Sequence, residues 1–123
     1  MATIKSVTLN PTFARLNDDR NFKLKENSSS REREAMVDIK LTNDGPTLKN
    51  GATVDFSKIY GFKRVYACVA VAYKGGTLNS SLTAHIHYEP SNTFDASTGK
   101  IRQVGGTPNQ LYGMTITVLI RGN

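Results

Sequence analysis

The feature that most constrains this chain is the strict alternation of apolar and polar residues in short runs that end at turn residues. In the run 36–41, Val37, Ile39 and Leu41 alternate with Asp38 and Lys40. The last run, 114–122, alternates in the same way. Because successive side chains of a strand point to opposite faces, each run predicts a β-strand with one buried face and one solvated face.

The remaining strands are predicted from the same signal. They cover residues 4–9, 22–26, 52–56, 63–73, 82–89 and 99–104, and Gly, Pro, Asn and Asp are frequent between them. No helical stripe of apolar residues separates the runs, so we expect an all-β fold, an antiparallel β-sandwich that is jelly-roll-like. The 123 residues fit a single β-sandwich domain, 1–123. Within it, residues 1–35 are candidates for a partly extended N-terminal arm and loop.

The polar segment 27–35 carries charges of both signs, which predicts a solvated loop. A short helix that begins at Ser30, with Arg33 and Glu34 in its first turn, is the alternative. The strand predicted for residues 4–9 is either the first strand of the domain's own sheet or a strand donated to a neighbouring subunit.

The segment 63–73 is the most apolar part of the chain, because both of its alternating faces are apolar. This predicts a central strand covered on both sides, by the second sheet or by a neighbouring subunit. One small sandwich does not cover both faces fully, so we expect self-association as a dimer or trimer. Cys68, the one cysteine of the chain, lies in this segment, and we expect it to be a buried, unreactive thiol.

His85, His87 and Glu89 form the sharpest candidate for a metal site. Residues two apart on a strand share a face, and His and Glu are suitable ligands for zinc, iron or manganese. The His-x-His spacing resembles the cupin metal motif. Cupins, however, place the Glu further along and add a His from a later strand, whereas this chain has two His in total. The alternative is the polar outer face of an ordinary strand, and we expect no metal or cofactor.

Signals for enzymatic chemistry are weak. The residues Ser97-Thr98-Gly99-Lys100 have the ending of a phosphate-binding loop but lack its preceding glycine, so we interpret them as a turn in which Gly99 has a positive φ. No pair of carboxylates is spaced for acid–base work. We therefore expect no enzymatic activity and no catalytic residues.

The charge balance suits an acidic partner, because 16 Lys and Arg stand against 10 Asp and Glu, a net charge of +6. That partner is either nucleic acid or an acidic protein surface. A nucleic-acid-binding β-barrel would use basic pairs near aromatic residues: Lys23 and Lys25, Lys63 and Arg64, Lys100 and Arg102, with Tyr60, Phe62 and Tyr66. The basic residues are spread through the sequence and interleaved with acidic residues, so we place nucleic-acid binding second. No apolar run approaches the ~20 residues that span a membrane.

The end of the chain carries a longer pattern. Tyr88-Glu-Pro is followed by Ser97-Thr-Gly-Lys-Ile-Arg, a glycine-rich loop and Leu111-Tyr-Gly-Met-Thr-Ile-Thr-Val-Leu-Ile-Arg-Gly. This ending resembles that of small virion structural proteins of tailed bacteriophages, and the resemblance covers residues 60–123.

The resemblance implies a non-enzymatic virion protein, with a role as a capsid decoration or cement protein that stabilises the phage head. Its partner would be the major capsid protein, and it would be made in the host cytoplasm and act on the capsid exterior. A basic protein would be attracted to an acidic shell, and many copies would turn weak contacts into firm attachment. The alternatives are a nucleic-acid-binding β-barrel and a cupin-like metalloprotein.

Overall fold

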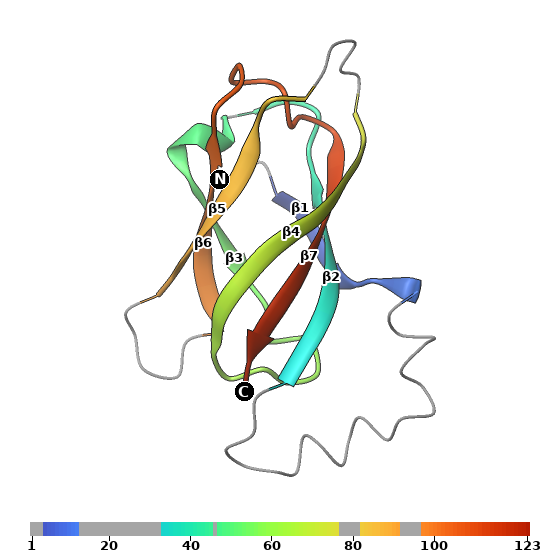
Figure 1. Ribbon diagram of the computed structural model, residues 1–123, viewed down its shortest axis with the longest axis vertical. Helices are drawn as coiled ribbons and strands as arrows, with labels where there is room; N and C mark the ends of the chain where they lie inside the picture. Colours follow the sequence, from blue (N-terminus) through green and yellow to red (C-terminus); the bar gives the residue numbers. More distant parts are fainter. Residues whose placement is uncertain (1–3, 13–32, 46, 77–81, 92–96) are drawn as a thin grey trace.

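The structure is a computed structural model, and it describes residues 4–12, 33–45, 47–76, 82–91 and 97–123. Within these residues the elements are β1 (Ile4–Leu9), β2 (Arg33–Leu41), the 3-10 helix η2 (Leu48–Asn50), β3 (Ala52–Asp55), β4 (Val65–Gly75), β5 (His85–Pro90), β6 (Thr98–Val104) and β7 (Met114–Gly122). The strands form two packed layers (Figure 1). The prediction of an all-β antiparallel sandwich is confirmed.

The two sheets have the strand orders β1-β2-β7-β4 and β3-β6-β5, and every pairing is antiparallel. The strand pairs are nested in sequence order: β2 pairs with β7, and β3 and β6, which lie between them in the sequence, pair in the other sheet. β4 and β5 lie between β3 and β6 in the sequence, and each belongs to a different sheet. This nesting of strand pairs is jelly-roll-like. It leaves β4 and β5 at neighbouring edges of the two sheets, where they contact each other (Figure 1).

The alternating runs place their apolar residues in the core as predicted. In β2 and β7 every second side chain is buried, and the register joins Val37 to Val118 and Ile39 to Ile116. The fully buried large side chains of the two sheets and their connections are Phe56, Phe62, Ile39, Leu48, Ile101, Leu111, Ile116, Ile120, Val37, Val54, Val65 and Val118. Burial of these residues is the main stabilising contribution to the sandwich.

The N-terminal expectations have mixed outcomes. β1 pairs with β2 along residues 4–9, so this strand belongs to the domain's own sheet. The loop predicted over residues 27–35 is wrong for its last three residues, because β2 begins at Arg33. The helix alternative is wrong for Arg33 and Glu34 for the same reason. Residues 27–32 and the strand predicted for 22–26 lie outside the described residues.

The side chain of Arg33 explains why the strand begins there. The residue is only 8% exposed, its guanidinium lies 4.4 Å from the centre of the Phe62 ring, and its Nη1 donates a hydrogen bond to the carbonyl of Tyr60 at 2.9 Å. An arginine can be buried in this way because the ring and the carbonyl oxygen replace part of its hydration. This burial of Arg33 could not be predicted from the sequence, because the segment 27–35 around it is polar.

Candidate interaction surface

β4 carries three of the four large hydrophobic side chains that are exposed in the described part of the chain, and the fourth is Val104 on β6. Val69 is 60% exposed, Val71 is 50% exposed and Tyr66 is 38% exposed. The prediction that residues 63–73 form a central strand is wrong, whereas their cover by a neighbouring subunit stays a prediction. β7 takes the central position between β2 and β4, and β4 is an edge strand. Its inner side chains, Cys68, Ala70 and Tyr73, pack on the core.

Two β-bulges shape this edge. The pairing of β4 with β7 shifts by one residue between Val65 and Ala67 and again between Ala70 and Ala72, so Tyr66 and Val71 are the extra residues. A bulge residue has no partner in the ladder, and it bends the strand and re-aims its side chain. Bulges also blunt an edge against pairing with another strand.

An apolar row crosses the outer face of the four-stranded sheet. The register aligns Met36 of β2 with Leu119 of β7, and Leu119 with Val69 of β4. Met36 and Leu119 are half-buried, and Val71 lies two residues further along β4. Sequence reasoning did not identify Met36 and Leu119 as surface residues, although both are apolar residues at polar positions of alternating runs. The structure joins them to Val69 because β7 lies between the other two strands.

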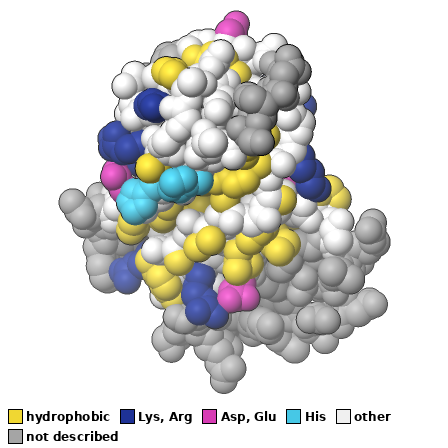
Figure 2. All heavy atoms as spheres, turned by 45° about the horizontal axis from the view of Figure 1, so that its top comes forward, with side chains coloured by type: hydrophobic (Ala, Val, Ile, Leu, Met, Phe, Trp, Pro, Cys, Tyr) yellow, Lys and Arg dark blue, Asp and Glu magenta, His cyan; other side chains and the backbone are white. Residues whose placement is uncertain are grey.

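A groove of about 470 Å³ follows the seam where β4 meets β5. Its lining comes from both edges: Tyr66, Ala67, Cys68, Val69, Ala70, Tyr73, His85, Ile86, His87 and Tyr88. Figure 2 shows a band of hydrophobic side chains that begins beside the two histidines. The seam thus combines hydrophobic side chains with polar groups, and it carries imidazoles on its β5 side.

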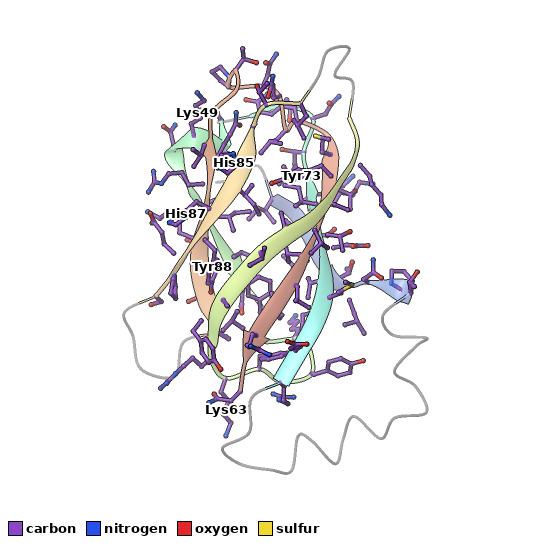
Figure 3. The ribbon with its side chains drawn as sticks, viewed as in Figure 1. Lys49, Lys63, Tyr73, His85, His87 and Tyr88 are labelled. Atoms are coloured by element: carbon purple, nitrogen blue, oxygen red, sulfur yellow. The ribbon has the colours of Figure 1, made fainter. Side chains whose placement is uncertain are left out.

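Side-chain hydrogen bonds close the seam. The Tyr73 hydroxyl accepts a bond from the Ile86 amide at 3.0 Å, and the Tyr88 hydroxyl donates one to the Val65 carbonyl at 2.8 Å (Figure 3). Gln110 Oε1 accepts a bond from the Ala84 amide, just before β5, at 2.9 Å. The backbone amides of Ala84 and Ile86 thus donate to side chains, and they are not available to hydrogen-bond an added strand. The seam therefore offers side-chain contacts rather than a free strand edge.

Burial sets the chemistry of the seam. It raises the pKa of the Cys68 thiol from 9.0 to about 12, and it is the main cause that raises the pKa of Tyr88 to about 12. The thiolate is the reactive form of cysteine, so at neutral pH Cys68 is a poor nucleophile and a poor metal ligand. Cys68 is partly buried and lines the groove, so the expected burial is met in part and its low reactivity stays a prediction.

The predicted row His85, His87 and Glu89 lies on the outer face of β5, with both imidazoles exposed. Cations stand opposite the row: the register pairs His87 with Arg102, whose Nη2 lies 3.4 Å from Glu89 Oε1. Within the described ranges no group of three or more His, Cys, Asp or Glu side chains is placed to hold a metal ion. The Arg102 guanidinium pairs with Glu89, the carboxylate that would have to bind the metal. A cupin site also uses a histidine from a later strand, and the chain has no histidine after His87.

The basic pairs predicted for nucleic-acid binding do not form one stripe. Lys63 and Arg64 lie just before β4, next to Asn123, and the backbone amides of both residues donate hydrogen bonds to the carbonyl of Asn123. Lys100 and Arg102 lie on β6 of the other sheet. Figure 3 shows Lys63 and Lys49 at opposite ends of the sandwich.

The aromatic residues predicted to accompany these pairs differ in burial. Phe62 is 1% exposed and belongs to the core, whereas Tyr66 is exposed beside the seam. Tyr60 is partly buried and packs against the core. Lys23 and Lys25 lie outside the described residues. Of the three rings, Tyr66 is therefore the one with the most exposed side chain.

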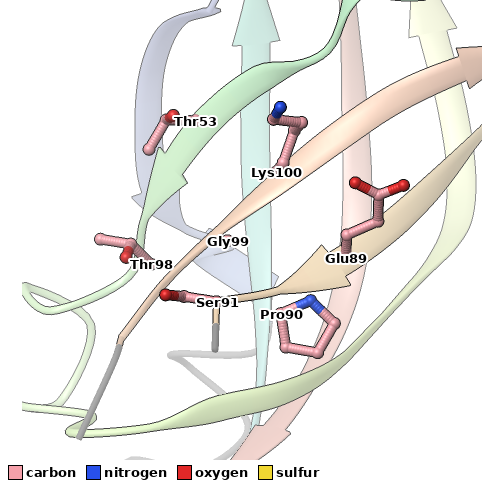
Figure 4. Close-up of a pocket in the computed structure, with 7 residues that line it drawn as sticks. All are labelled: Thr53, Glu89, Pro90, Ser91, Thr98, Gly99 and Lys100. Carbon is pink, nitrogen blue, oxygen red and sulfur yellow. The ribbon is translucent and has the colours of Figure 1, made fainter. Parts of the chain in front are cut away.

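A second, polar hollow of about 290 Å³ lies on the three-stranded sheet (Figure 4). Its lining consists of Thr53, Glu89, Pro90, Ser91, Thr98, Gly99 and Lys100. The turn predicted at Gly99 is wrong, because Gly99 lies within β6 opposite Val54 and Pro90 and is not among the positive-φ residues. A Cβ on Gly99 would lie 2.4 Å from the Tyr88 hydroxyl, so glycine is needed for close packing.

Comparisons with known proteins find nothing similar: no protein-family model, no curated protein and no solved structure matches the chain. No helix in the described part of the chain is long and apolar enough to cross a membrane.

Proposed function

We propose that the protein is a non-enzymatic structural protein of a phage virion, a decoration or cement protein that binds the exterior of the head and stabilises it. The observation that carries the proposal is the apolar surface of β4, where Val69 is 60% exposed and Val71 50% exposed beside the half-buried Leu119. A contiguous exposed apolar patch on a protein domain often marks a site where another molecule binds.

The architecture supports a binding role. Jelly rolls are frequent among capsid and lectin domains, which use the sandwich to present surface. Such an analogy of fold does not by itself determine function. The resemblance of residues 60–123 to small virion proteins supports a phage head as the assembly that the protein binds. The net charge of +6 would attract the protein to an acidic capsid surface.

Self-association as a dimer or trimer belongs to the same proposal. The seam groove, whose lining includes the exposed side chains of Tyr66 and Val69, is the surface that a second copy would cover. Analytical ultracentrifugation over a range of concentrations tests this. A monomer at every concentration would refute self-association without affecting the binding of heads.

Binding to heads is the direct test. Heads are purified from a mutant of the encoding phage that lacks this gene, and the protein is added at rising concentration before the heads are sedimented. We expect saturable binding at a fixed copy number per capsomer and a higher temperature of head disruption. Absence of saturable binding, or a gene that lies outside a cluster of phage structural genes, would overturn the proposal.

The same purified protein also tests the alternative that it is a nucleic-acid-binding β-barrel. Filter binding to duplex and single-stranded DNA is measured over a salt series, because neutralisation of phosphates makes affinity fall steeply with salt. We expect no retained DNA near physiological salt. Tight binding with a steep salt slope would favour the nucleic-acid alternative.

A further inference from the structure

The outer face of the four-stranded sheet carries its side chains in rows that cross the strands. Above the apolar row of Met36, Leu119 and Val69 lies a second row, which we call the lysine row. The register places Thr115 of β7 between Lys40 of β2 and Lys74 of β4. The four residues from Leu119 to Thr115 separate the two rows by about 14 Å along β7.

The ammonium groups of this end have no acidic partner among the described residues. Lys40 and Lys74 are exposed, as is Lys5 on β1, and neither of the described ion pairs involves them. Lys5 and Lys40 line a hollow of about 450 Å³ together with Leu41, Thr42, Asn43, Gly76 and Gly113. The hollow presents two cations with room for a carboxylate from outside.

Among the described residues, Asp38 and Glu34 are the carboxylates of this face, and both are already engaged. Asp38 Oδ1 accepts hydrogen bonds from Thr117 Oγ1 at 2.8 Å and from Asn10 Nδ2 at 3.0 Å. Glu34 Oε2 lies 2.7 Å from Arg121 Nη2. These acids therefore satisfy partners within the sheet, whereas no ion pair of the described residues involves the lysines.

We propose that this outer face binds an acidic protein surface, with apolar side chains of the partner on the apolar row and carboxylates of the partner on the lysine row and its hollow. The inference rests on the proposed function and names the part of the protein that meets the capsid. Apolar contact supplies affinity at the centre, and opposite charges at the rim speed association and set the orientation.

A second copy of this chain fits the face less well. If two copies pack with their strands parallel, each lysine row meets the other lysine row. If they pack antiparallel with the apolar rows in register, each lysine row lies toward the end of the partner sheet where Glu34 is already paired with Arg121. The first arrangement places like charges together, which costs affinity, and the second offers the lysines a carboxylate that is already engaged.

Three variants test the proposal by the head-binding assay described above, each first checked for an unchanged circular dichroism spectrum and melting temperature. Val69→Glu places a charge in the apolar row at a largely exposed position. The double variant K40E/K74E reverses the lysine row. The control K58E/K100E makes the same change in net charge at two exposed positions, one on β6 and one in the turn after β3.

We expect V69E and K40E/K74E each to weaken binding to heads at least tenfold and the control to change it less than twofold, with a shallower salt dependence for K40E/K74E. If the wild type binds heads and all three variants bind equally well, the inference is overturned while the proposed function stands. If the wild type does not bind, the proposed function itself fails. Because Val69 also lines the seam groove, the oligomeric state of each variant is measured as well. Weaker head binding by V69E together with a changed oligomeric state, and unchanged head binding by K40E/K74E, would assign the face to a second copy and overturn the inference.

Discussion

Removal of the Tyr88 hydroxyl is a direct test of how the two sheets are joined at their open edges. Tyr88 is 9% exposed, and its hydroxyl donates a hydrogen bond of 2.8 Å to the Val65 carbonyl on β4. The substitution Tyr88→Phe keeps the ring, which packs against Phe56 with centroids 6.2 Å apart and lies over Gly99. It therefore removes the bond with little change in packing.

The expected loss follows from the burial of that bond. A net contribution of about 1 kcal/mol is typical of a protein hydrogen bond, and an acceptor left without a donor adds to the cost, so we expect Y88F to lower the free energy of unfolding by about 1–2 kcal/mol. For a domain of this size that corresponds to a fall in melting temperature of roughly 4–8 °C.

The pH dependence gives a second readout. Because burial raises the pKa of Tyr88 from 10.0 to about 12, the folded protein favours the neutral phenol. The stability due to this preference is complete below pH 10 and is lost as the pH rises through 12, since the unfolded state ionises first. Phenylalanine cannot ionise, so the stability difference between wild type and Y88F should narrow between pH 10 and pH 12.

Urea unfolding followed by far-ultraviolet circular dichroism measures both effects, because the chain has no tryptophan to report by fluorescence. Tyr112→Phe is the matched control: its hydroxyl donates to the Gly45 carbonyl in an exposed contact, and we expect a smaller loss. A loss for Y88F no larger than that for Y112F would refute the argument that the seam is held by this bond.

Three further predictions concern local packing and reactivity. Gly99→Ala should cost about 1–3 kcal/mol in urea unfolding, because its Cβ would lie 2.4 Å from the Tyr88 hydroxyl, and a loss below about 0.5 kcal/mol would contradict the close packing. Cys68 should react with a thiol reagent at pH 8 far more slowly than in unfolded protein, since a pKa raised from 9.0 to about 12 leaves about a thousandfold less thiolate; a ratio under about tenfold would mean that the thiol is open to solvent. Arg33→Met should lower stability by about 1–2 kcal/mol through loss of the Phe62 contact and the buried hydrogen bond, and unchanged urea unfolding would place Arg33 outside the core.

The candidate surface shows where sequence reasoning stops. The apolar character of residues 63–73 and the alignment of His85, His87 and Glu89 on one face are both predictable, because they depend on local order alone. The choice of β7 as the central strand depends on which strands pair, and an apolar run suits an edge next to a partner as well as a centre. The row of Met36, Leu119 and Val69 exists only through the pairing register.

The sequence by itself determined most of the strands and the sandwich class, since side chains alternate along a regular strand with a period of two. Residues such as Val37, Ile39 and Ile116 could only face a core. Only the tertiary structure decided that β4 lies at an edge, that Gly99 makes room for Tyr88, and that the lysine row stands about 14 Å from the apolar row. Those properties come from contacts between residues far apart in the chain, and local propensity carries no information about them.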